Sequence, residues 1–258
     1  MSGACVGPGR RSLEGLAWLA RVGASPLEPL RLVLGCNERR AHDHVQRLTA
    51  AGLVKRVAMR RGDGSLIVLT TNGALEAGYP ANRAPRSLAP TTWAHSSACA
   101  WVSAWLALRL QTRWAADPQM AWWSDRDVLG DRFWRREVRY QDRRGSVRVM
   151  HRPDLGVRIA GRAVPVEVEL QRKVRARLLG ILSMYAQLSS GQDAPYGGVI
   201  YVTASDDVSG AVRSVAADAG LRAPQLSVRA LAEVIEQTRA AALELAAGRA
   251  AARAGGAP

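Results

Sequence analysis

Three carboxylates in one stretch of the chain, Asp154, Glu167 and Glu169, could together hold a divalent metal ion. Apolar and polar residues alternate on both sides of Gly161-Arg162, which predicts a β-hairpin with a two-residue turn. In that register Asp154 faces Glu169, and Glu167 lies on the same face. Like charges on facing strand positions, with Cβ atoms about 5 Å apart, repel unless a cation lies between them. A hard divalent cation with oxygen ligands meets this demand, so these three residues are the candidate metal ligands.

The register of the hairpin depends on this turn. We expect the first strand over residues 155–160 and the second over residues 163–170. A turn at Gly161-Arg162 pairs Val157 with Val166, so the reverse face of the hairpin is apolar. The alternative is a solvated polar face on which the acids gather by chance.

The charge of the chain indicates a polyanionic partner. Its 258 residues include 36 Lys and Arg against 22 Asp and Glu, a net charge of +14. Double-stranded DNA is the expected partner, because a basic surface attracts the phosphate backbone. A coding bias toward Arg explains Arg in place of Lys, but it does not explain the net excess.

The composition also limits the class of protein. With 48% hydrophobic and 22% charged residues, it is typical of a globular chain. No apolar run approaches the roughly 20 residues of a membrane span, and no signal peptide is apparent. Three scattered cysteines offer no zinc-ligand spacing and favour a reducing compartment. We therefore expect a cytoplasmic location with no membrane contact.

Residues 12–79 predict three helices followed by a β-ribbon. A Gly-rich, basic tail is expected over residues 1–11, and the first helix begins at Ser12. Ser25-Pro26 indicates the start of a second helix, which ends at Gly35. Asn37 is the expected N-cap of a third helix from Glu38 to Ala51.

The ribbon that follows completes the pattern of a winged helix-turn-helix. Strands are expected over residues 53–60 and 66–70, around a Gly-rich turn at residues 61–64. This order resembles winged-helix regulators of the MarR type. The resemblance implies that the third helix enters the major groove and that the wing contacts the backbone, although winged helices also mediate protein contacts. The candidate groove residues are Arg39, Arg40, His44 and Arg47, and the candidate phosphate contacts are Lys55, Arg56, Arg60 and Arg61.

A second domain is expected over residues 91–245, after a Pro-rich linker at residues 80–90. It begins with a helix that ends near Trp114. Ser124 then caps a short helix together with Asp127. Strand pieces at residues 137–140 and 145–150 lead into the hairpin.

The chain after the hairpin completes an α+β pattern. A helix with a buried stripe that includes Leu178, Ile181 and Tyr185 is followed by the apolar run Val199–Thr203. That run is typical of a central strand covered on both faces. A helix, a short strand near Gln225 and a last helix to about Leu245 follow, and residues 246–258 are expected to fray.

This order of elements resembles the PD-(D/E)xK, or restriction-endonuclease-like, nuclease fold. The fold class is therefore α/β, α+β overall: a winged helix-turn-helix followed by a mixed-sheet nuclease-like domain. The resemblance implies that Pro153-Asp154 and Glu167 hold Mg²⁺, with Mn²⁺ as a substitute. The chain departs from the pattern at Glu169, where the family has Lys. Lys173, at the start of the next helix, is the nearest replacement, so Asp154, Glu167, Glu169 and Lys173 are the candidate catalytic residues.

Taken with the winged helix, the segments Trp123–Asp127, His151–Asp154 and Glu167–Lys173 resemble the replication-relaxation family of actinobacterial plasmids and mobile elements. The resemblance implies a DNA-binding protein with a role in replication or DNA relaxation, and a domain that nicks DNA by metal-dependent hydrolysis. It also implies association with the nucleoid or a plasmid. A homodimer and other proteins of a replication or conjugation complex are further candidate partners. The main alternative is a non-enzymatic DNA-binding regulator or replication accessory factor with a degenerate nuclease fold. A protein-interaction module is a third, and a tyrosine relaxase is disfavoured because no His cluster accompanies the tyrosines.

Overall fold

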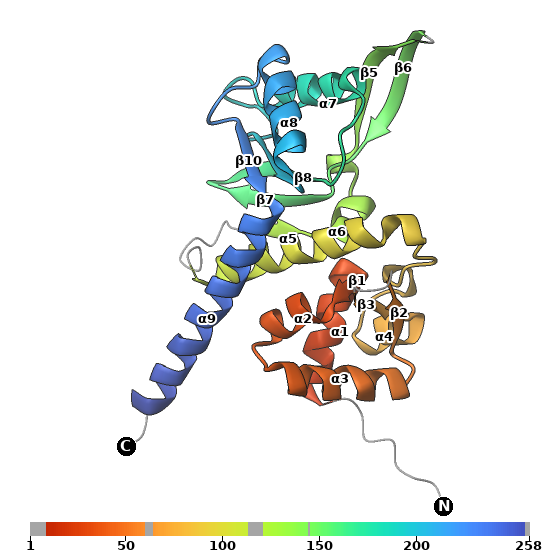
Figure 1. Cartoon of the computed structure of the whole chain (residues 1–258), viewed down its shortest axis with the longest axis vertical. Helices are drawn as coiled ribbons and strands as arrows, with labels where there is room; N and C mark the ends of the chain where they lie inside the picture. Colours follow the sequence, from red (N-terminus) through yellow and green to blue (C-terminus); the bar gives the residue numbers. More distant parts are fainter. Residues whose placement is uncertain (1–8, 60–63, 113–120, 144, 256–258) are drawn as a thin grey trace, which may run out of the picture. The chain divides into compact units, whose positions relative to one another are not determined.

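The computed structural model describes residues 9–59, 64–112, 121–143 and 145–255. The chain forms two compact units, residues 1–100 and residues 101–258 (Figure 1). The boundary lies within helix α5 (Trp93–Thr112) and not in the segment 80–90. That segment contains one short 3-10 turn, Ala81–Arg83, and a second, Pro90–Thr92, begins at its last residue. The two units together make a mixed α+β protein, as the sequence predicts.

The first unit has the element order of a winged helix. Its three-stranded antiparallel sheet has the order β1-β3-β2. The elements are α1 (Arg10–Val22), β1 (Ala24–Pro26), α2 (Leu27–Leu34), α3 (Glu38–Ala50), β2 (Val54–Ala58), β3 (Ser65–Leu69) and α4 (Thr71–Glu76).

Helix α3 begins where the sequence predicts. The side chain of Asn37 accepts a hydrogen bond of 2.9 Å from the backbone N–H of Arg40, which satisfies one of the free donors of the first turn. Ala41, Val45 and Leu48 are buried, so the apolar stripe of the helix faces the core of the unit.

Two local predictions for the first unit are wrong. Ser25-Pro26 belongs to an edge strand, β1, and helix α2 begins only at Leu27. Pro is tolerated there because an edge strand pairs on one side only. The expected N-terminal tail is also shorter, because α1 begins at Arg10; residues 1–8 lie outside the described part of the chain.

The second unit is built on a mixed five-stranded sheet of order β10-β9-β8-β7-β4. β8, β9 and β10 are parallel, whereas β7 is antiparallel to both of its neighbours. A separate two-stranded sheet joins β5 and β6. The elements after α5 are β4 (Trp122–Trp123), α6 (Asp125–Gly130), β5 (Arg136–Asp142), β6 (Gly145–His151), β7 (Leu155–Ile159), β8 (Arg162–Glu169), α7 (Arg175–Leu188), β9 (Val199–Thr203), α8 (Asp206–Asp218), β10 (Leu226–Ala230) and α9 (Leu231–Gly255).

The core of this unit follows the apolar patterns of the sequence. All five residues of β9 are buried between two neighbouring strands, as expected for a central strand. Leu178, Ile181 and Tyr185 on α7 are buried in one cluster with residues of β9 and α8, so the predicted stripe is confirmed. Ser124 and Asp127 form the predicted capping box at the start of α6.

The last helix is longer than expected. Helix α9 continues to Gly255, beyond the predicted end near Leu245. Its second half is rich in Ala, the strongest helix former, which favours continuation over fraying. Within the described residues, no helix is both long and apolar enough to cross a membrane.

Candidate functional site

The hairpin of β7 and β8 has a turn one residue earlier than predicted. Ala160-Gly161 forms the turn, with φ angles of 49° and 77°, as in a type I′ hairpin. Val157 therefore pairs with Val164 and not with Val166, a shift of two residues along β8. Because side chains alternate with a period of two, a shift of two keeps every side chain on its predicted face.

The corrected register changes which acids are neighbours. Leu155 pairs with Val166, so the next position places Asp154 opposite Glu167 and not opposite Glu169. The backbone N–H of Val168 donates a hydrogen bond of 2.7 Å to Asp154 Oδ2. This bond ties the carboxylate of Asp154 to the strand that carries both glutamates.

Glu167 is held inside a polar cluster. Its side chain is 4% exposed; His151 Nε2 lies 2.7 Å from its Oε1, and the hydroxyl of Tyr185 donates to the same oxygen. Burial alone would raise the pKa of Glu167, but His151, Lys173 and Tyr185 outweigh burial and lower that pKa below its usual value. Glu167 is therefore an ionised carboxylate at neutral pH.

Lys173 reaches this acidic region from the segment before α7. Its ammonium group donates to Glu169 Oε2 and forms an ion pair. Burial lowers the pKa of Lys173, while the carboxylates of Glu167 and Asp154 act in the opposite direction. The chain thus supplies a cation beside the acids, although its direct partner is Glu169.

The carboxylates of the three acids do not converge on one common ligand site. Among the described residues, Asp154, Glu167 and Glu169 do not form a group whose ligand oxygens all lie within 4.8 Å of one another. Glu169 is engaged by Lys173. Asp154 directly precedes β7, and the register of β7 and β8, continued by one residue, sets it opposite Glu167. Asp154 and Glu167 are therefore the two acids that this register brings opposite each other.

A further acid belongs to this region. Asp125 is the first residue of α6, and 38% of its side-chain surface is exposed. Packing around its carboxyl group raises the pKa of Asp125 to about 7; Arg126 opposes this rise and Asp154 adds to it. Sequence reasoning recognised the helix cap at Ser124 and Asp127 but missed Asp125, whose only signal is its place between them.

Two more contributors were missed as site residues. His151 stands three positions before Asp154 and ends β6, whereas Tyr185 was expected only as part of the buried stripe of α7. Their hydroxyl and imidazole groups lie 3.1 Å apart, and both contact Glu167. Such a three-way contact joins residues far apart in the sequence, so spacing alone does not reveal it.

The winged helix presents most of its predicted DNA contacts. Arg39, Arg40 and Arg47 are exposed on α3, and Lys55 and Arg56 are exposed on β2. Arg40 and Arg47, together with Arg11 of α1, line a groove of about 630 Å³. Arg60 and Arg61 lie outside the described residues.

The prediction for His44 is wrong. Its side chain is buried at 6% exposure on the face of α3 that packs toward α1, where a Cβ at Gly15 would approach His44 Nε2 to 2.9 Å. Burial lowers the pKa of His44, with Arg47 and Arg11 acting in the same direction, so the ring is neutral at pH 7. His44 packs within the winged helix and also lines the groove of Arg11, Arg40 and Arg47.

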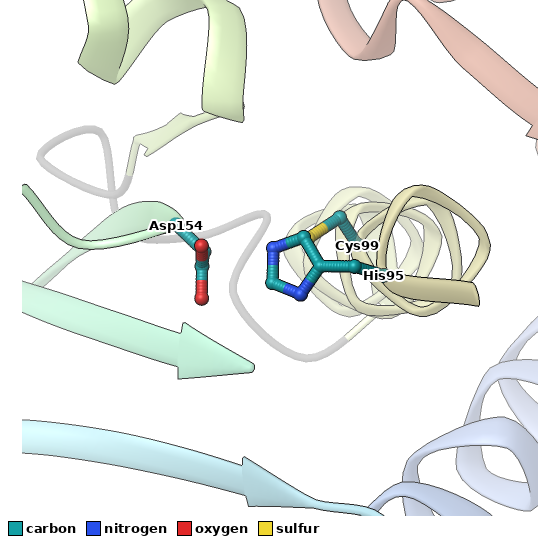
Figure 2. Close-up of side chains that lie close together, drawn as sticks. All are labelled: His95, Cys99 and Asp154. Carbon is teal, nitrogen blue, oxygen red and sulfur yellow. The ribbon is translucent and has the colours of Figure 1, made fainter. Parts of the chain in front are cut away.

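His95 and Cys99 form a separate contact on α5. Cys99 Sγ lies 3.4 Å from His95 Nε2, one helical turn away. Figure 2 shows these two side chains together with Asp154 of the segment before β7. Because the first two belong to residues 1–100 and Asp154 belongs to the second unit, their placement carries no argument for a metal site.

The chain shows weak similarity to a solved structure. No protein-family model and no curated protein matches it. A solved structure titled "Crystal structure of protein VC1899 from Vibrio cholerae" is similar at a TM-score of 0.34 and 11% identity. The match covers 92% of this chain and 57% of that one, and at this score it supports no conclusion about fold or function.

Proposed function

We propose that this protein binds double-stranded DNA through its winged helix and holds Mg²⁺ at Asp154 and Glu167 in a nuclease-type domain. The observation that carries the second part is the hairpin itself. Asp154 directly precedes β7, and the register of β7 and β8, continued by one residue, sets it opposite Glu167 in a mixed sheet followed by α7. Two carboxylates on adjacent strands supply oxygen ligands of the kind that Mg²⁺ prefers.

The described part of the winged helix supports the first part of the proposal. Exposed Arg39, Arg40 and Arg47 lie on α3, the helix that enters the groove in proteins of this fold. Lys55 and Arg56 add positive charge on β2. The net charge of +14 favours association with a polyanion.

The residues around Asp154 and Glu167 suit phosphodiester hydrolysis. When bound, Mg²⁺ would acidify the attacking water and offset charge on the scissile phosphate. His151 and Tyr185 fix the carboxylate of Glu167 in one orientation. Lys173 would stabilise negative charge that develops on the phosphate. To do so, its ammonium group would leave Glu169 and contact the phosphate of the substrate. The resemblance to the replication-relaxation family suggests the biological role of this chemistry. The protein would nick the DNA of a plasmid or mobile element and so relax its supercoils.

A second candidate function is a non-enzymatic DNA-binding regulator or replication accessory factor. The ion pair between Lys173 and Glu169 favours it, because the cation expected to face the substrate is already engaged. Glu169 also occupies the position where the nuclease pattern has Lys. In this function the second unit would retain the fold for DNA contact or for assembly with a second copy.

A nicking assay separates the two candidates. Purified protein is incubated with supercoiled plasmid and Mg²⁺ or Mn²⁺, beside the Asp154→Ala and Glu167→Ala variants. The proposal expects open circular product from the wild type alone. Equal conversion by all three proteins would assign the activity to a contaminant, and no conversion by any of them would favour the non-enzymatic function. Asp193→Asn, which changes an exposed acid elsewhere in the second unit, is the matched control and should nick like the wild type.

A further inference from the structure

The strands β5 and β6 form an arm that is separate from the main sheet of the second unit. Each strand has seven residues, and among the strands that the structure describes these two pair with each other and with no third (Figure 1). At about 3.4 Å per residue, strands of this length extend about 24 Å. The arm is therefore long enough to lie across a DNA major groove, which is about 12 Å wide.

One face of the arm is anchored. Val138 is buried, and Tyr140 and Val149 pack against the same core cluster as α7. At Gly180 of α7 a Cβ would come within 2.8 Å of the carbonyl oxygen of Arg139, so helix and arm are in close contact. This packing fixes which face of the arm is turned toward solvent.

The opposite face is exposed and positively charged. Arg139 and Arg148 are direct cross-strand partners, and both are exposed. Like charges on facing positions destabilise a strand pair unless an anion compensates them. Glu137 compensates in part, since its Oε1 lies 2.5 Å from Arg139 Nε; Arg139 and Arg148 both lower the pKa of Glu137. One cation of this pair therefore remains without a matching acid on this face.

The surrounding sequence adds to this charge. Residues 135–150 contain six arginines and two acidic residues. Arg135 and Arg143, near the two ends of β5, are exposed as well. Arg136 has a different role, because its guanidinium group lies over the rings of Phe133 and Tyr196 at 5.3 and 5.6 Å.

The arm leads directly into the acidic site. β6 ends at His151, whose Nε2 contacts Glu167, and the chain reaches Asp154 three residues later. Because side chains alternate along a strand, His151 lies on the anchored face of the arm with Val149, whereas Arg148 lies on the exposed face. The arm and the acidic site are thus adjacent along the chain but present different faces.

We propose that the exposed face of the β5–β6 arm is a second DNA-binding surface, which holds the phosphate backbone of a duplex on the strand pair that leads to Asp154 and Glu167. Arg139 and Arg148 make the central contacts, and Arg143 extends them toward the tip. This inference rests on the proposed DNA-binding function and deepens it, because it assigns DNA contacts to the second unit and not to the winged helix alone. It requires neither a bound metal nor cleavage.

The test measures binding of the full-length protein to a fluorescent 30-base-pair duplex in EDTA, over a range of salt concentrations. Each phosphate contact contributes about 0.9 to the slope of log affinity against log salt. In the double variant Arg139→Ala/Arg148→Ala the magnitude of that slope should fall by about 1.8, and the affinity at low salt should fall about tenfold. The matched control, Arg222→Ala/Arg249→Ala, removes two exposed arginines elsewhere in the same unit, one from the loop before β10 and one from α9, and should change the slope by less than half as much.

A second variant tests whether a more positive arm binds duplex DNA more tightly. Glu137→Gln removes the acid beside Arg139 and should raise duplex affinity about two- to threefold, a change that a folding defect would not produce. Equal slopes for the arm variant and its control, or no gain with Glu137→Gln, would overturn the inference. Loss of single-stranded but not duplex binding would overturn it as well.

The outcome is distinguishable from that of the nicking assay. If the arm variant binds like the wild type while the wild type nicks plasmid, the arm inference fails and the proposed nuclease stands. If the arm variant loses duplex affinity while no protein nicks, the arm inference stands and the catalytic part of the proposed function fails.

Discussion

The carboxylate of Glu167 and the imidazole of His151 lie 2.7 Å apart, and both side chains are at most one-tenth exposed. A buried carboxylate is costly unless it is paired and hydrogen-bonded. Here His151 and Tyr185 supply that stabilisation from two different elements, β6 and α7. The acid at the centre of the candidate site is thus kept ionised and oriented by the fold itself.

The lowered pKa of Glu167 predicts a pH dependence of stability. A carboxyl group whose pKa is lower in the folded than in the unfolded state stabilises the fold above its unfolded value and loses that contribution as pH falls through the folded value. The free energies of unfolding in urea of the wild type and of Glu167→Gln should therefore differ at pH 7, and this difference should shrink below about pH 4. A difference in the free energy of unfolding that stays constant from pH 7 to pH 3 would contradict the lowered pKa.

The ion pair between Lys173 and Glu169 predicts that substitutions at these two residues change the free energy of unfolding non-additively. Lys173→Ala leaves the carboxylate of Glu169, which is 10% exposed, without its cation and should destabilise the protein by about 3 kcal/mol. Adding Glu169→Gln should restore most of that loss, because no uncompensated charge remains. Denaturant midpoints of the two single variants and the double variant measure the coupling. Additive losses would mean that the pair does not form in solution.

The exposed arginines of α3 predict a loss of DNA affinity without a loss of stability. Arg39→Ala and Arg40→Ala should each weaken duplex binding and reduce the salt slope by about 0.9 for every phosphate contact removed. Both positions are exposed and lie outside the core, so the melting temperature should shift little.

His44 provides the contrast on the same helix. His44→Leu replaces a buried, neutral ring with an apolar side chain and should leave duplex affinity unchanged. If His44→Leu weakens binding as much as Arg39→Ala while both proteins remain folded, α3 presents a different face to DNA. Anisotropy titrations of the three variants beside the wild type provide this comparison.

Much of the fold follows from local patterns in the sequence. Asn37 caps α3 and Ser124 caps α6, because each places a side-chain oxygen before a helical run. The apolar run that begins at Val199 forms the central strand, since only a strand covered on both faces tolerates such a run. The acidic face of the hairpin was also predictable, because period-two alternation fixes the face even when the register shifts by two.

The register itself and the partners of the acids were not predictable. The turn places Ala160 at positive φ, a conformation that Ala rarely adopts, so the sequence favoured Gly161 as the first turn residue. His44 carries a polar side chain at a position that tertiary packing buries. The contacts of Glu167 with His151 and Tyr185 span 16 and 18 positions along the chain, and no spacing rule connects them.

The central claim is that Asp154 and Glu167 hold a divalent cation. Isothermal titration of Mn²⁺ into metal-free, full-length protein tests it without DNA and without catalysis. We predict one bound ion per chain for the wild type and for the Asp193→Asn control, and at least tenfold weaker binding for Asp154→Asn and for Glu167→Gln. Absence of binding to the wild type, or equal binding by all four proteins, would contradict the claim.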